Sequence, residues 1–76
     1  MKMSKELKTG QVWERTKYTG FKSYYLIHHI LEDIGQVVYS KVYPPEFKYE
    51  RYYEIWNIDS FLRQNAQKLI IPESEG

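Results

Sequence analysis

The sequence contains no cysteine, which excludes a disulfide scaffold, a cysteine-built zinc module and a thiol redox centre. Long apolar runs are absent too. The longest covers residues 24–27, whereas a membrane-spanning helix needs about 18. Neither sign of charge dominates, because 11 Lys and Arg face 10 Asp and Glu, for a net charge of +1. These absences predict a small soluble domain without a membrane partner.

Motifs for catalysis are also missing. The chain has neither a nucleophile elbow nor a glycine-rich phosphate loop, and Ser40 and Ser60 have no triad partners recognisable in the sequence. On a strand, Glu50 and Glu54 would stand about 13 Å apart, too far for a paired general acid and base. We therefore expect a protein that is not an enzyme and that needs no cofactor.

The two histidines are adjacent, at His28 and His29. Neighbouring side chains on a strand point to opposite faces of the sheet, so two such imidazoles could not chelate one metal ion. No cysteine is present to complete a site from another segment. We expect one imidazole in the wall of the core, one near the surface, and no metal site.

Aromatic residues are abundant instead. Eight Tyr, three Phe and two Trp make up 17% of the 76 residues, whereas Ala66 is the only alanine. Large rings fit the pleated surface of a sheet, and each can bury roughly 150–250 Å². The composition therefore favours β structure with an aromatic core. Our candidates for that core are Trp13, Tyr39, Tyr53, Trp56 and Phe61.

Turn residues divide the chain into short segments. Turns are predicted at Gly10, Gly20 and Gly35, between stretches rich in β-branched and aromatic residues. Asn57 or Asp59 can cap a short helix. The expected elements are strands at residues 11–16, 23–32, 36–43 and 68–71 and a helix at residues 60–67.

Residues 49–56 (YERYYEIW) fit two structures. Tyr49, Tyr52, Tyr53 and Trp56 have the spacing of a helical stripe. Five of the eight residues are aromatic or β-branched, however, and this composition favours a strand. We favour the strand and keep the helix as the alternative.

Five short strands in so small a chain must close on one another to bury a core. At residues 8–13 (KTGQVW), 37–39 (VVY) and 56–61, the chain resembles the SH3-like small barrels. More narrowly, it resembles small uncharacterised proteins of bacteria and their phages. The resemblance implies a mainly β fold, an SH3-like five-stranded small barrel with one short helix before the last strand. The alternative is an α+β fold, in which a β-hairpin sheet packs on C-terminal helices.

The ends of the chain differ from its middle. Residues 1–7 are polar and basic and lack the apolar stretch of a signal peptide, and residues 72–76 are acidic. We expect a single domain at residues 8–71, flexible segments at residues 1–7 and 72–76, and a cytoplasmic location.

Charge is distributed unevenly along the chain. Residues 1–24 carry six basic and two acidic side chains, whereas residues 44–60 carry two basic and four acidic ones. Such polarity can steer a partner, or it can be neutralised by ion pairs within the molecule. We favour internal pairing, because mixed surface charge is ordinary.

The predicted loops combine aromatic and basic side chains. Exposed rings beside Lys or Arg suit a protein interface or stacking on bases, or they can simply cover the ends of a barrel. Lys17 and Lys22 stand where a peptide-binding SH3 domain carries an acidic loop, so we do not expect recognition of proline-rich peptides. The candidate binding residues are Lys17, Tyr18, Phe21, Lys22, Tyr43, Phe47 and Tyr49.

The functional prediction follows from the charge balance. Domains that bind nucleic acid usually carry a strong basic excess, which this chain lacks. We therefore expect a non-catalytic protein-binding module, and the resemblance implies a phage or mobile-element accessory protein that acts on a host protein. The alternative is a small barrel that binds nucleic acid through its basic N-terminal half.

Overall fold

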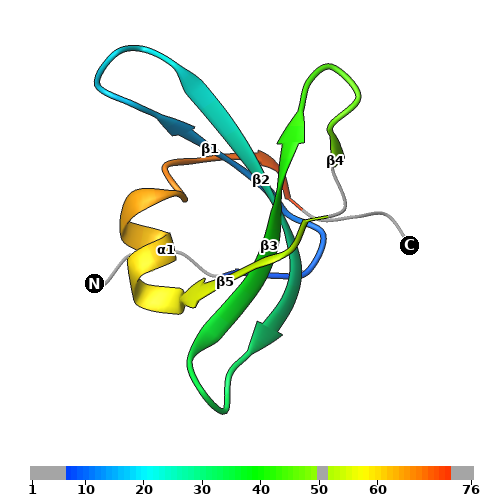
Figure 1. Cartoon of the computed structure of the whole chain (residues 1–76), viewed down its shortest axis with the longest axis vertical. Helices are drawn as coiled ribbons and strands as arrows, with labels where there is room; N and C mark the ends of the chain where they lie inside the picture. The colour runs from blue at the N-terminus through cyan, green and yellow to red at the C-terminus, as the bar shows by residue number, and fades with distance from the viewer. Residues whose placement is uncertain (1–6, 50–51, 73–76) are drawn as a thin grey trace.

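The predicted mainly β architecture is confirmed in a computed structural model, which describes residues 7–49 and 52–72 (Figure 1). Two of the predicted strands have the expected bounds, and the others differ by one or two residues at their ends or are divided. The elements in chain order are β1 (Val12–Thr16), β2 (Lys22–Leu31), β3 (Gln36–Tyr43), β4 (Lys48–Tyr49), β5 (Glu54–Asn57), α1 (Ile58–Gln64) and β6 (Lys68–Ile71).

All strands belong to one antiparallel sheet with the order β4–β3–β2–β1–β6, and β5 pairs with β3. Since β2 occupies one edge of β3, β4 and β5 share the other. Val42 and Tyr43 pair with β4, and residues 36–39 pair with β5. The sheet is thus five strands wide, with its outer strand in two segments. The strand favoured for residues 49–56 is confirmed at both ends of that stretch, whereas Tyr52 and Tyr53 belong to no strand and residues 50–51 lie outside the described part.

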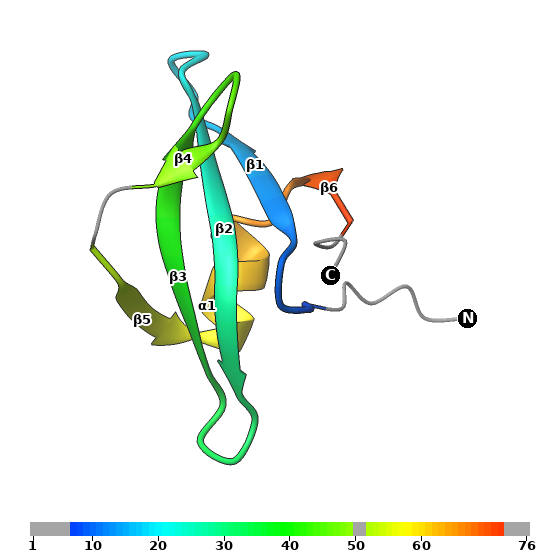
Figure 2. The same cartoon turned by 90° about the vertical axis from the view of Figure 1, so that its right-hand side faces the viewer.

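The sheet does not close into a barrel, so that part of the fold prediction was wrong. Within the described residues, β6 pairs only with β1, and β5 pairs only with β3. Both strands have only four residues, and α1 lies between them on the concave side of the sheet (Figures 1 and 2). The helix, rather than a closing strand pair, covers the core. The alternative fold was wrong too, because the described part of the chain has this one helix of seven residues.

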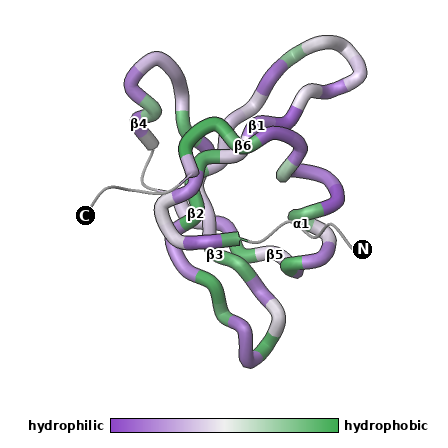
Figure 3. The backbone as a smooth tube through the Cα atoms, turned by 180° about the vertical axis from the view of Figure 1, so that it is seen from behind, coloured by the Kyte–Doolittle hydropathy of each residue, from purple (hydrophilic) through white to green (hydrophobic). Residues whose placement is uncertain are grey.

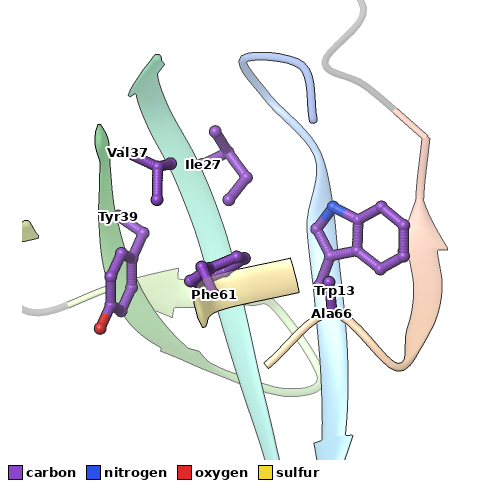
Figure 4. Packing of buried hydrophobic residues seen from close by; sticks show 6 residues of the cluster. All are labelled: Trp13, Ile27, Val37, Tyr39, Phe61 and Ala66. Carbon is purple, nitrogen blue, oxygen red and sulfur yellow. The ribbon is translucent and has the colours of Figure 1, made fainter. Parts of the chain in front are cut away.

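The core lies between the concave face and α1 (Figure 4). Phe61, which is 0% exposed, places its ring 4.8 Å from that of Tyr39 and 6.0 Å from that of Tyr25, measured between centroids. Trp56 is half-buried against this cluster, whereas Tyr53 is 59% exposed, so its assignment to the core was wrong. The buried members of the cluster are Trp13, Ile27, Val37, Tyr39, Phe61 and Ala66.

A β-bulge interrupts β2 at His28. Ile27 pairs with Tyr39 and His29 with Val38, so His28 is the extra residue. The bulge breaks the alternation of side chains. His28 reaches Ser40, and His29 lies opposite Val38, which shares a face of β3 with Ser40. The prediction that the two imidazoles lie on opposite faces was therefore wrong. No group of three or more potential metal ligands occurs among the residues described.

The helix begins where a cap is available. Asn57 has an extended backbone, and its side-chain oxygen accepts a hydrogen bond from the Ser60 N–H at 3.1 Å. Gly35 adopts a positive φ of 68° in the β2–β3 turn, and its carbonyl accepts from the Ile58 N–H at 2.9 Å, which ties the turn to α1. No helix in the described ranges is long and apolar enough to cross a membrane.

The predicted flexible segments fall largely outside the described part of the chain. Of these residues, Leu7 and Pro72 are described, and Leu7 packs against the core cluster.

Candidate binding surface

Two loops project from the same end of the sheet but diverge from each other, the β1–β2 loop at residues 17–21 and the β3–β4 loop at residues 44–47 (Figures 1 and 2). Hydrogen bonds close the first loop tightly. The Gly20 N–H donates to the Lys17 carbonyl at 2.8 Å, and the Lys17 N–H donates to the Phe21 carbonyl at 2.8 Å. Gly20 adopts a φ of 92°, which favours glycine. This turn returns Phe21 to the start of β2, beside the neighbouring strands.

Lys41 lies between the β1–β2 loop and the end of β3. Its Nζ atom lies 5.8 Å from the ring centroid of Phe21 and 5.8 Å from that of Tyr43, and the Nζ of Lys17 lies 5.6 Å from the Phe21 ring. These are cation–π distances. We call Lys17, Phe21, Lys41 and Tyr43 the loop-end surface. Sequence analysis missed Lys41, although strand alternation does place it on the same face as Tyr39 and Tyr43.

The rings of the loop-end surface are open to solvent. Phe21 is 57% exposed and Tyr43 is 46% exposed. Tyr18, at the tip of the first loop, is fully exposed, and Lys22 is exposed at the start of β2. Coloured by hydropathy, both loops are mostly hydrophilic or neutral, whereas hydrophobic stretches follow the strands, α1 and the β2–β3 turn (Figure 3).

One predicted binding residue, Phe47, lies apart from this surface. Phe47 is half-buried, and its ring meets that of Tyr24 edge-on, with 5.5 Å between centroids. Tyr24 pairs with Val42, the neighbour of Lys41 and Tyr43, and therefore belongs to the opposite face of the sheet. The backbone of Tyr49 also pairs with Val42.

A groove of about 510 Å³ adjoins the loop-end surface and shares Lys41 with it. The Arg15 guanidinium donates to the Asn65 side-chain oxygen at 3.1 Å, which fixes its position. The Tyr39 hydroxyl donates to the Glu54 carboxylate at 3.2 Å, and burial together with that carboxylate raises the pKa of Tyr39. The groove is lined by Arg15, Tyr25, Tyr39, Lys41, Glu54, Ile55, Trp56 and Asn65.

The cations around this region are not neutralised within the described part of the chain. The one ion pair found there joins Lys48 to Glu46, at 3.2 Å between exposed side chains. Ion pairs between the basic N-terminal segment and the acidic later segment, which the sequence favoured, are therefore not found among the described residues. The acidic side chains of Glu32 and Asp33 lie at the β2–β3 turn, at the other end of the sheet (Figure 2). Around the loop-end surface and the groove, the cations without a described acidic partner are Arg15, Lys17, Lys22 and Lys41.

The fold also joins a serine to a histidine, which the sequence did not reveal. The Ser40 hydroxyl donates to the Tyr52 carbonyl at 2.6 Å, so it accepts the 2.9 Å hydrogen bond from His28 Nε2. Burial, with His29 nearby, lowers the pKa of His28. Because the Ser40 proton is held by a carbonyl and Ser40 is only 1% exposed, this pair is unsuited to nucleophilic catalysis. It fastens the segment before β5 to the sheet.

The described residues thus form a cationic and aromatic surface with an adjoining groove, and this is the candidate binding surface. Neither gathers a nucleophile, a base and an orienting group. No known family model, curated protein or solved structure matches the chain.

Proposed function

We propose that this chain is a non-catalytic binding module that meets a protein partner through the loop-end surface. The observation that supports this most directly is the position of Lys41 between the Phe21 and Tyr43 rings. It brings the end of the β1–β2 loop and the end of β3, which are more than 20 residues apart in the sequence, into one surface. Exposed aromatic rings are typical of the anchors that dominate protein interfaces, and the lysines around them suit the polar rim of such an interface.

Two further expectations belong to this proposal. The strand order, with the last strand beside the first and one short helix before it, supports an open relative of the SH3-like small barrels. The resemblance of residues 8–13, 37–39 and 56–61 to small proteins of bacteria and phages suggests an accessory role, in which the module occupies the surface of a host protein. The polar surface of the loops suits a cytoplasmic setting.

The test compares captured proteins between variants. The wild-type chain and the Phe21→Ala, Tyr43→Ala and Ile34→Ala variants would be immobilised and exposed to nuclease-treated bacterial lysate, and the captured protein would then be purified for titration. Ile34 is the control, because it is 64% exposed but lies in the β2–β3 turn, at the other end of the sheet. At the better anchor, the loop-end substitutions should cost about 2 kcal/mol or more of binding free energy. If the wild type and all three variants captured the partner protein equally well, the proposal would be contradicted.

Nucleic-acid binding is the second candidate, and the cations without a described acidic partner favour it. If Arg15, Lys17, Lys22 and Lys41 neutralised about four phosphates, the slope of log affinity against log salt would be near −3 to −4. Two features favour the protein instead: lysines lie over the Phe21 ring, where a base would stack, and the net charge is only +1. A gel shift with random-sequence DNA or RNA at 150 mM salt would reverse this preference.

A further inference from the structure

We propose that the groove beside β5 receives an extended acidic segment of the protein partner, which adds to the sheet as a strand. This inference rests on the proposed protein-binding function and names how the partner is held. It starts from the open sheet. Within the described residues, β5 pairs only with β3, so its other edge is free (Figure 2). A free edge presents main-chain groups that can pair with another chain.

The register identifies those main-chain groups. The Ile58 N–H donates to the Gly35 carbonyl, and Trp56 and Glu54 follow in register with Val37 and Tyr39. In an antiparallel ladder, hydrogen-bonded pairs alternate with non-bonded ones. The pairs of Trp56 and Glu54 are therefore the bonded ones, and the N–H and C=O of Ile55 point away from β3. Ile55 is thus the residue that would pair with an added strand.

The two faces beside this edge differ in chemistry. On the concave face, Arg15 and Lys41 line the groove together with Glu54 and Trp56. Ile55 borders the groove, but its register opposite Val38 assigns its side chain to the other face, where Ile55 and Tyr53 are each 59% exposed. Side chains of an added strand alternate between these faces. The matching segment therefore alternates acidic residues, directed to Arg15 and Lys41, with apolar residues that cover Ile55.

Substitutions at Glu54 and at Lys41 should change the affinity for an acidic strand in opposite directions. Its carboxylate lies in the groove and accepts a hydrogen bond from Tyr39, so it repels an acidic segment. Glu54→Gln keeps an oxygen that can accept the Tyr39 hydroxyl and removes the charge. The substitution should strengthen binding of an acidic strand severalfold, whereas Lys41→Gln should weaken it about tenfold.

The experiment titrates the full chain with an acetylated, amidated peptide of alternating Glu and Val, followed by NMR and amide exchange. The expected result is slower exchange at the Ile55 and Asn57 amides, with no slowing by the same peptide carrying Gln in place of Glu. Ile55→Pro removes the edge N–H without touching a β3 pair and should weaken binding about tenfold, while Ile55→Val should retain it. A thermal melt of each variant establishes that it is folded.

Three outcomes would overturn the inference. They are equal binding of the Glu and Gln peptides, stronger binding of a single-stranded oligothymidylate at the same groove, and protection of Ile55 by self-association alone as the protein concentration rises. If a lysate partner is captured in a loop-dependent manner while Ile55→Pro and Glu54→Gln leave its affinity unchanged, strand addition fails and the proposed function stands. If no partner is captured, the proposed function fails whatever the peptide does.

Discussion

The half of the sheet beneath α1 and the half near the loops are built differently. Beneath the helix, Phe61 and Val37 are 0% exposed, and Ile27 is 1% exposed. Near the loops, Phe21 and Tyr43 are about half exposed, and lysines lie over their rings. The helix seals one half of the concave face and leaves the other half as a groove. The comparison indicates that stability resides mainly in the covered half, which leaves the open half available for binding.

The largest expected effect comes from breaking the covered half. Phe61→Ala removes the ring that packs against Tyr25 and Tyr39, and it should lower the free energy of unfolding by about 3–5 kcal/mol. Urea denaturation followed by circular dichroism measures the loss. Phe21→Ala is the matched substitution in the open half and should stay within about 0.5 kcal/mol of wild type. Similar losses in the two variants would mean that the loop end is as structural as the core.

The two tryptophans sharpen the comparison, because they differ in burial. Trp13 is 6% exposed, and its indole N–H donates to the buried Gln11 oxygen at 2.9 Å, whereas Trp56 is only half-buried at the groove. Trp13→Phe should cost about 1–2 kcal/mol through lost packing and the lost hydrogen bond. Trp56→Phe should cost less than about 1 kcal/mol. Urea denaturation measures the loss of unfolding free energy in both variants. A larger loss for Trp56→Phe would indicate that the core is centred nearer to β5.

Local signals in the sequence located most elements. The strand at residues 36–43 ends where Pro44 and Pro45 follow it. Asn57 caps the helix because its side-chain oxygen can accept a hydrogen bond from a free backbone N–H of the first turn. These features depend on neighbours in the chain, so pattern and turn chemistry were sufficient to predict them. Lys17 and Phe21 in the first loop, and Tyr43 at the end of β3, were singled out for the same reason.

Long-range geometry accounts for what was missed. The bulge at His28 depends on how β2 pairs with β3, and no residue near it signals the shift. Closure of the sheet depends on whether β5 reaches β6, which α1 prevents. Lys41 joins the binding surface because its strand lies opposite the first loop. Such features follow from the packing of distant segments, on which one sequence gives little direct information.

A smaller effect concerns the junction between the halves, where β5 passes into α1. Asn57→Ala removes the oxygen that accepts from the Ser60 N–H, and it should cost about 1 kcal/mol. Asn57→Asp retains an acceptor at the helix start and should cost only a few tenths of that amount. Thermal melting of the three proteins measures the difference. Equal melting temperatures for wild type and Asn57→Ala would show that tertiary packing alone positions α1.

The smallest expected effect is a pH dependence at the segment that leads into β5. His28 donates to Ser40, which in turn holds the Tyr52 carbonyl, and burial lowers the pKa of His28 in the folded protein. The unfolded chain then binds the proton more readily than the folded one. The contribution of His28 to stability is therefore complete above its unfolded pKa of about 6.5, and it declines as the pH falls towards the lower folded value. His28→Gln keeps a side-chain N–H for Ser40 and removes the titration, so its urea midpoint should vary less than that of wild type between about pH 7 and pH 5. If the urea midpoints of wild type and His28→Gln change in parallel with pH, other titrating groups determine the pH dependence of stability. The His28–Ser40 contact then contributes to stability only as a hydrogen bond.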